Sequence, residues 1–306
     1  MEIGNYILVT PARNEEAYLE KTIDAVVAQT IRPRRWVIVS DGSTDRTDEI
    51  ASRGAGAHSF IQFVRRNRPA DGPKDFGSKV KAFKEGYQQL TNVEYDFLGN
   101  LDADIVLPTN YFERLLGKFR ANPKLGVGGG IVCEPEKDKL VPQHTSLNSV
   151  CGSVQLFRRE CYEAFGGYVP IRLGGVDAAA EIMARMHGWT VETFTDLPVK
   201  AQRRVLTGGA TILHTRFRQG ISNYLLGYHP IFQVASSLSR INEPPYGVGA
   251  ACTLLGYLSS WIQRKGKSLP PEVICFLRRE QMQRLVNLTG TRTPHGAQNH
   301  RQPEEN

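Results

Sequence analysis

The sequence predicts an α/β protein with a mostly parallel sheet, flanking helices and a basic, mainly helical C-terminal extension. Strand-like and helix-like segments alternate through the first hundred residues, which is the βαβαβ pattern of a sheet covered on both faces. Three polar clusters follow the expected strands directly. Ligands of such sheets bind beyond the carboxyl ends of the strands, so we expect the three clusters to share one edge.

The first half of the chain alternates regularly. Leu19, Ile23 and Val26 repeat at helical spacing after the first strand, and Asn14 is expected to cap that helix. Two prolines and two glycines predict a loop before the next long helix. The expected elements are strands at 6–10, 35–40 and 58–64, a short helix ending near 52, a loop at 65–77, and a helix at 78–91.

The central feature is an apolar run at residues 96–108 that contains Asp102 and Asp104. The run suits a buried strand, and two ionised carboxylates at its end are costly unless they are paired or bound to a metal. Hard oxygen ligands of this kind suit Mg²⁺ or Mn²⁺ together with a diphosphate. A solvated turn after a strand is the alternative interpretation.

The second half is predicted in less detail. A glycine-rich strand or turn at 126–130 indicates that some group approaches the backbone closely. A glycine-ended loop leads to Asp177, and the apolar face of a helix follows until Gly188 ends it. The other expected elements are a helix with apolar residues at 112–119, strands at 153–157 and 189–194, and helices at 159–165, 212–226 and 274–288.

Charge divides the chain into unequal parts. Residues 197–306 hold 14 basic and 5 acidic side chains, out of 38 Lys+Arg and 31 Asp+Glu in the whole chain. This surplus indicates contact with an anionic membrane surface or a phosphorylated acceptor, and no nucleic-acid-binding signature accompanies it. The expected organisation is a catalytic domain at 1–196, a basic helical extension at 197–288, and a disordered polar tail at 289–306.

Residues 246–262 carry no charge but include three glycines, two serines and a threonine. A run of 17 residues is at the lower limit for a bilayer span, so we expect a buried or membrane-lying helix. The five cysteines are odd in number and widely spaced, which indicates neither a disulfide framework nor a zinc site. With no signal-peptide pattern at the N-terminus, we expect a cytoplasmic protein, peripheral at the inner membrane face.

Taken together, four motifs resemble the family 2 glycosyltransferases of the GT-A (Rossmann-like) fold. They occur in the family's order, each after an expected strand or at a helix start, and the resemblance covers roughly residues 5–195. The motifs are Pro11-Ala12-Arg13-Asn14-Glu15, Asp41-Gly42-Ser43-Thr44-Asp45, Asp102-Ala103-Asp104, and Asp177.

The resemblance implies a nucleotide-sugar donor and a divalent cation, with the base of the nucleotide read by Asp41 and the metal held by Asp102 and Asp104. A carboxylate facing a uracil-like N–H favours a UDP-linked sugar. Basic residues near the diphosphate are implied before the metal strand and after the last core strand. The implied donor-binding residues are Pro11, Ala12, Arg13, Asn14, Glu15, Asp41, Ser43, Lys79, Lys81, Asp102, Ala103, Arg203 and Arg204.

Asp177 is the implied general base, which removes the proton of an acceptor hydroxyl during an inverting displacement. Its position at a helix N-terminus favours a carboxylate, and an ordinary helix cap is the alternative role. The sequence departs from the family at Val176, where a glutamate is common, and it lacks the histidine that often completes the metal site. His214, Gln202 or water remain as third ligands.

The predicted function is transfer of a sugar to a hydroxyl of a glycan or lipid-linked acceptor. A sugar nucleotidyltransferase is a second hypothesis, although the turn after the first strand lacks the glycine-rich loop expected of that class. A nucleotide-sugar-binding scaffold of the same fold is a third, favoured by Val176 and by the missing histidine.

Overall fold

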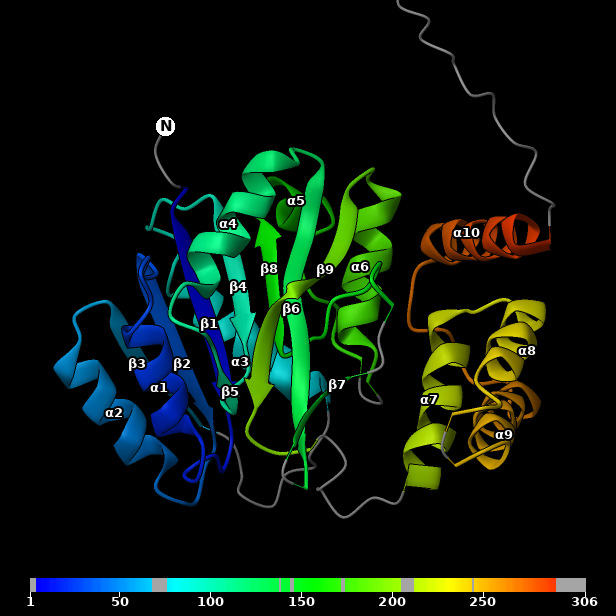
Figure 1. Ribbon diagram of the computed structural model, residues 1–306, viewed down its shortest axis with the longest axis horizontal. Helices are drawn as coiled ribbons and strands as arrows, with labels where there is room; N and C mark the ends of the chain where they lie inside the picture. Colours follow the sequence, from blue (N-terminus) through cyan, green and yellow to red (C-terminus); the bar gives the residue numbers. More distant parts are fainter. Residues whose placement is uncertain are drawn as a thin grey trace, which may run out of the picture.

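The computed structural model describes residues 4–67, 76–137, 139–143, 146–171, 174–204, 212–243 and 245–289. They form a sheet unit with helices on both faces and a helical unit beside it, next to α6 (Figure 1). The strands are β1 Tyr6–Ala12, β2 Arg35–Asp41, β3 Ile61–Arg66, β4 Phe97–Leu101, β5 Ile105–Val106, β6 Leu125–Glu136, β7 Lys139–Pro142, β8 Val154–Arg158 and β9 Thr190–Ala201. The helices are α1 Leu19–Val27, α2 Thr47–Ala57, α3 Phe76–Gln88, α4 Tyr111–Ala121, α5 Arg159–Ala164, α6 Val176–Met186, α7 Ile212–Leu226, α8 Pro230–Ser239, α9 Val248–Ile262 and α10 Pro271–Thr289.

The sheet has the strand order β3-β2-β1-β4-β8-β6-β9-β5, with β7 paired to β6. The first half is parallel as predicted, because β1 pairs in parallel with β2 and β4, and β2 with β3. The second half is mixed, because β8 runs antiparallel to both β4 and β6. The prediction of a mostly parallel sheet therefore describes strands β1–β4 better than the rest of the sheet.

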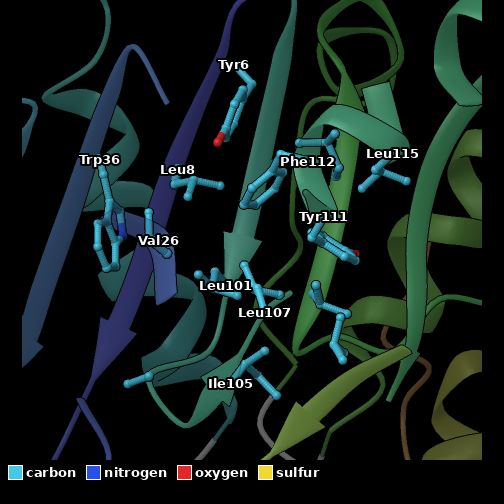
Figure 2. Close-up of a cluster of buried hydrophobic side chains, with 14 of the residues drawn as sticks. Tyr6, Leu8, Val26, Trp36, Leu101, Ile105, Leu107, Tyr111, Phe112 and Leu115 are labelled. Carbon is cyan, nitrogen blue, oxygen red and sulfur yellow. The ribbon is translucent and has the colours of Figure 1, made fainter. Parts of the chain in front are cut away.

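Each face of the sheet is covered by its own apolar layer. Tyr6 and Leu8 of β1 enter the layer beneath α1, α2 and α4, where the ring of Tyr6 stacks on Phe112 at 4.4 Å (Figure 2). Ile7 and Val9 point to the other face and pack under α3, α5 and α6. Because β1 is covered on both sides, consecutive residues of the strand are apolar, and apolar and polar residues do not alternate.

The last strand of the sheet extends further than the sequence predicts. β9 runs to Ala201, and its end pairs with the two-residue β5 that follows the Asp102–Asp104 turn. The sheet therefore continues past residue 196, the expected domain boundary. The close approach expected at 126–130 is the backbone of β9, because a Cβ built on Gly130 would lie 2.0 Å from the Leu197 carbonyl oxygen.

The helical unit consists of α7, α8, α9 and α10, and α8 is an element that the sequence analysis did not single out. Glycines allow α7 and α9 to touch backbone to backbone, since a Cβ on Gly220 would lie 1.9 Å from the Thr253 carbonyl oxygen. α10 joins this unit to α6 through an apolar cluster that includes Ile182 and Leu277. Residues 246–262 are helical as expected, and no helix in the described ranges is both long and apolar enough to cross a bilayer. The expected disordered tail lies outside the described residues from 290 onward.

Candidate active site

The turns after β1 and β2 are joined by side-chain hydrogen bonds. The Asn14 side-chain oxygen accepts from the Thr44 backbone N–H at 2.9 Å, and the Asn14 N–H donates to Ser43 Oγ. The Glu15 N–H donates to Thr47 Oγ1 at 2.7 Å. The prediction that Asn14 caps α1 is wrong, because α1 begins at Leu19 and Asn14 adopts φ 55°, a left-handed conformation that asparagine tolerates.

Asp41, at the end of β2, ties two further elements together. One oxygen pairs with Arg66 at the end of β3 at 2.7 Å, and the other accepts from Ser78 Oγ at 2.6 Å. Ser78 lies in the first turn of α3 and immediately precedes Lys79. Asp41 therefore fixes the start of α3 and, through it, the position of Lys79.

The turn after β4 carries two carboxylates that face two cationic side chains. Asp102 Oδ1 lies 2.5 Å from Lys79 Nζ, and Asp104 Oδ2 lies 2.7 Å from Arg203 Nε. The Arg203 guanidinium also reaches Glu15 Oε1 at 2.7 Å, so it bridges the β1 turn to the β4 turn. The pairing of β5 with β9 brings Arg203 here, because Arg203 follows the end of β9 by two residues.

Asp177 is the second residue of α6, and Gly175 is the N-cap of this helix with φ 90°. Its Oδ1 accepts the Ala178 N–H at 2.9 Å, and a Cβ built on Gly152 would lie 3.0 Å from Asp177 Oδ2. Burial lowers the pKa of Lys79, but the charges of Asp102 and Asp177 outweigh burial and leave that pKa above its usual value. The base candidate thus lies within electrostatic reach of the β4 turn.

Negative charge exceeds positive charge in this cluster. Four carboxylates, at Glu15, Asp102, Asp104 and Asp177, meet the cations Lys79 and Arg203. Burial raises the pKa of Glu15 to about 7. Burial, and then the neighbouring Asp102 charge, raises the pKa of Asp104. With all four carboxyl groups ionised, the partly buried site would carry two excess negative charges, which suits a divalent cation or the basic side chains that replace it.

Asp102 and Asp104 could supply two oxygen ligands to such a cation. The described ranges contain no group of three or more His, Cys, Asp or Glu side chains arranged to hold a metal ion. Gln202 is engaged elsewhere, since its side-chain amide donates to the Tyr18 carbonyl at 2.9 Å. His214 lies on α7 with an exposed side chain. The remaining ligands would therefore come from diphosphate oxygens and water.

Other implied donor-binding residues lie at varying distances from the cluster. Lys81 is exposed on α3, whereas Lys79 is the residue of that helix paired with Asp102. Arg204 points toward β6, where it pairs with Glu136 at 2.9 Å. Ala103 is buried, and its carbonyl oxygen accepts from Thr22. Pro11 and Ala12 form the end of β1, and Arg13 follows them in the same turn, partly buried.

Glu181 is a buried carboxyl group near Asp177 that the sequence analysis did not identify. Glu181 lies one helical turn after Asp177, is 3% exposed, and accepts from the Val150 N–H at 2.7 Å and from Ser149 Oγ at 2.8 Å. Burial, followed by the charge of Asp177, raises the pKa of Glu181 to about 8. It anchors the segment that ends at Gly152, against which Asp177 packs. The signal was present as a single acidic residue in the apolar face of the predicted helix.

The family model for glycosyl transferase family 2 matches residues 7–182, which is more than half of the chain. The chain belongs to glycosyl transferase family 2. This confirms the resemblance and the prediction that the chain is a glycosyltransferase, and it disfavours a sugar nucleotidyltransferase. The matched range contains all four motifs, from the β1 turn to Asp177.

Relatives and solved structures agree with this family. The chain is 29% identical over 156 residues to poly-beta-1,6-N-acetyl-D-glucosamine synthase of Staphylococcus aureus, covering 50% of this chain and 32% of the relative. The enzyme of that name from Staphylococcus epidermidis is 30% identical over 46% of this chain and 29% of the relative. The chain thus matches about a third of the length of these relatives.

Two solved structures support the GT-A fold. A Pyrobaculum calidifontis mannosyltransferase in complex with GDP-Man and Mn²⁺ aligns with a TM-score of 0.54 and 17% identity, covering 94% of this chain and 76% of that one. Staphylococcus aureus TarS 1-349 in complex with UDP-GlcNAc aligns with a TM-score of 0.53 and 14% identity, covering 85% and 73%.

Proposed function

We propose that the protein transfers a sugar from a nucleotide-diphospho-sugar to a hydroxyl of a glycan or lipid-linked acceptor, with inversion at the anomeric carbon. The observation that carries this proposal is the convergence of Asp102, Asp104, Lys79, Arg203 and Asp177 from four separate parts of the chain. In a family 2 chain, Lys79 and Arg203 of this cluster would bind the diphosphate. Asp177 would be the carboxylate that faces the acceptor hydroxyl.

Asp177 acts in this proposal as the general base. Its carboxylate would take the acceptor hydroxyl proton while the oxygen attacks the anomeric carbon and the bond to the diphosphate breaks on the opposite face. General base catalysis of this kind typically contributes a factor of about 10² to 10⁴. Gly152 leaves room beside the carboxylate, since a Cβ there would lie 3.1 Å from Asp177 Cβ.

Lys79 and Arg203 hold the acidic turn and would turn toward the diphosphate when the donor binds. Lysine and arginine both bind phosphate, and the planar arginine group can do so with two parallel hydrogen bonds. A divalent ion held by Asp102 and Asp104, Mn²⁺ or Mg²⁺, would supply Lewis-acid neutralisation of the charge on the departing nucleoside diphosphate.

The donor we propose is a UDP-linked sugar. In support, relatives of the chain are named poly-beta-1,6-N-acetyl-D-glucosamine synthases, and TarS was solved with UDP-GlcNAc. The mannosyltransferase complex with GDP-Man makes a guanosine donor the competing case. We place the reaction at the cytoplasmic side of a membrane, on the strength of the basic last third of the chain.

Replacing Asp177 with asparagine tests the catalytic assignment. We expect the variant to bind the sugar nucleotide with unchanged affinity and to lose at least about 100-fold in transfer rate, because only the proton acceptor is removed. Asp196→Asn is the matched control, since Asp196 is an exposed carboxylate paired with Arg114 and Lys118. Substantial residual turnover by the Asp177 variant would exclude it as the base.

Replacing Asp104 with alanine tests the metal assignment. We expect nucleotide binding to lose its dependence on Mn²⁺ and turnover to fall at least about 100-fold, since charge neutralisation by a metal is worth several kcal/mol. Calorimetric titration of UDP into wild type and variant, with Mn²⁺ and with EDTA, measures this. Wild-type binding of equal strength under both conditions would refute the metal site.

A further inference from the structure

The helical unit presents large apolar side chains to its surroundings. On α8, Ile231, Val234 and Leu238 form an exposed stripe, and Leu238 is 57% exposed. On α9, Leu255, Leu258 and Ile262 form a second stripe at helical spacing, with Ile262 78% exposed. Isolated exposed apolar residues are ordinary, but two neighbouring helices that each expose a complete stripe indicate a surface that is covered by something else.

Part of the interior of the same unit is polar, beside apolar clusters that include Tyr257 and Leu277. Asn223, Gln233 and Ser237 are buried and form a chain in which each amide donates to the next residue, at 2.8 and 3.0 Å. A cavity of about 90 Å³ lies beside this chain between α7, α8 and α9. A buried polar chain together with exposed apolar stripes departs from the usual distribution of a protein in water.

The helices α7 and α9 pack backbone to backbone at two glycines. Besides the contact at Gly220, a Cβ built on Gly256 would lie 2.0 Å from the Phe217 carbonyl oxygen. Small residues that let helix backbones meet are typical of helices packed within lipid, where burial of apolar side chains provides no driving force. This packing is independent of the exposed stripes.

The charge around the apolar stripes identifies the covering partner. Residues 212–289 hold nine basic and three acidic side chains. Glu243 and Glu280 each pair with two arginines. Arg264 and Lys265 follow α9 directly, at the end that carries Trp261. Apolar helix faces with tryptophan and basic residues at their ends suit an anionic lipid surface better than the apolar face of another protein.

The length of α9 decides between spanning and lying on the membrane. Its 15 residues extend about 22 Å, whereas the hydrocarbon core of a bilayer is about 30 Å thick. We propose that α8 and α9 lie in the plane of an anionic bilayer, with their exposed stripes in the boundary between headgroups and acyl chains. This inference does not depend on the proposed chemistry.

Vesicle binding of the full chain tests the proposal. The protein should sediment with vesicles containing 30% phosphatidylglycerol in phosphatidylcholine and bind much less to phosphatidylcholine alone. Leu258→Ser with Ile262→Ser should weaken binding at least about tenfold through the lost apolar area, and Arg264→Gln should weaken it about fivefold. Leu147→Ser is the matched control, because Leu147 is 54% exposed but lies outside the helical unit.

Trp261 provides a second, direct measurement. It is 60% exposed, while Trp36 is fully buried and Trp189 is partly buried, so a vesicle-induced blue shift of fluorescence reports on α9. Quenching by bromine-labelled acyl chains should accompany the shift in wild type and in Leu147→Ser. The proposal is overturned if no blue shift occurs, or if the Leu258 and Ile262 substitutions instead abolish a dimer seen by light scattering without vesicles.

Discussion

The sheet unit and the helical unit differ in how many apolar side chains they expose and in where they place their polar groups. In the sheet unit Trp36 and Leu115 are 0% exposed beneath the helices, and the charged groups gather where strands end. In the helical unit Gln233 is 1% exposed, while Ile262 is 78% exposed. The first arrangement is stable in water because burial of apolar area drives folding. The second requires close backbone contacts and satisfied polar groups in its interior.

This contrast shows that the two units of the chain meet different physical requirements. The sheet unit must place carboxylates and cations in partly buried surroundings, where charge interactions are strong. The helical unit must hold its shape while presenting an apolar surface. α10 lets both coexist, because it packs on α6 through side chains such as Ile182 and Leu277.

Matched leucine substitutions should show the largest difference between the units. Leu115→Ala, in the sheet core, should lower the free energy of unfolding by about 2–5 kcal/mol, because it leaves a cavity. Leu255→Ala, on the exposed face of α9, should change it by less than about 0.5 kcal/mol in detergent-free buffer. Urea unfolding followed by circular dichroism measures both, and equal losses would mean that α9 is packed like a core helix.

The glycine contact between α7 and α9 should have the next largest effect. Gly256→Ala places a Cβ against the Phe217 carbonyl, so the helices must separate, at a cost of about 1–3 kcal/mol. Hydrogen exchange should increase in α7 and α9, while UDP affinity stays unchanged. Gly117→Ala on α4 is the control, since its Cβ meets no atom within 4 Å and it should stabilise by about 0.5–1 kcal/mol. Faster exchange in β1–β4 of the Gly256 variant would contradict separate units.

A further expected effect concerns pH and Glu181, the buried carboxyl group of the sheet unit. Because the pKa of Glu181 is raised to about 8 by burial, the stability from its neutral form is present below about pH 4.5 and is lost as pH rises toward 8. Glu181→Gln keeps the group neutral, so the Tm advantage of the variant should grow by about 5 °C between pH 5 and pH 8. Parallel Tm profiles for variant and wild type would show that this carboxyl does not titrate as described.

Local patterns predicted the strand ends and the helix start that carry Asp41, Asp102 and Lys79. The apolar run before Asp102 predicts a strand, and the proline- and glycine-containing loop at 65–77 predicts the helix start near Lys79, each from neighbouring residues alone. Parallel pairing then puts their ends on one edge, which is why Asp41 and Asp102 could be placed without knowing any contact.

Other features depend on partners distant in the chain. Asn14 follows the local rule for a helix cap, but its side-chain oxygen instead accepts a hydrogen bond from the Thr44 backbone N–H. The antiparallel insertion of β8 depends on pairing between strands separated by long segments, which periodicity does not encode. Glu181 differs from an apolar position only through its bonds to the 149–155 segment.

The short connection between the end of β9 and α7 limits how far the catalytic site can lie from the helical unit. Arg203 sits against Asp104 in the site, and α7 starts only eight residues after Arg204, a length of chain that reaches at most about 28 Å even when fully extended. With α8 and α9 resting on lipid, the sugar-accepting hydroxyl must come within a few nanometres of the bilayer. Under the proposed membrane contact, acceptor hydroxyls far from the lipid surface lie outside the reach of the site.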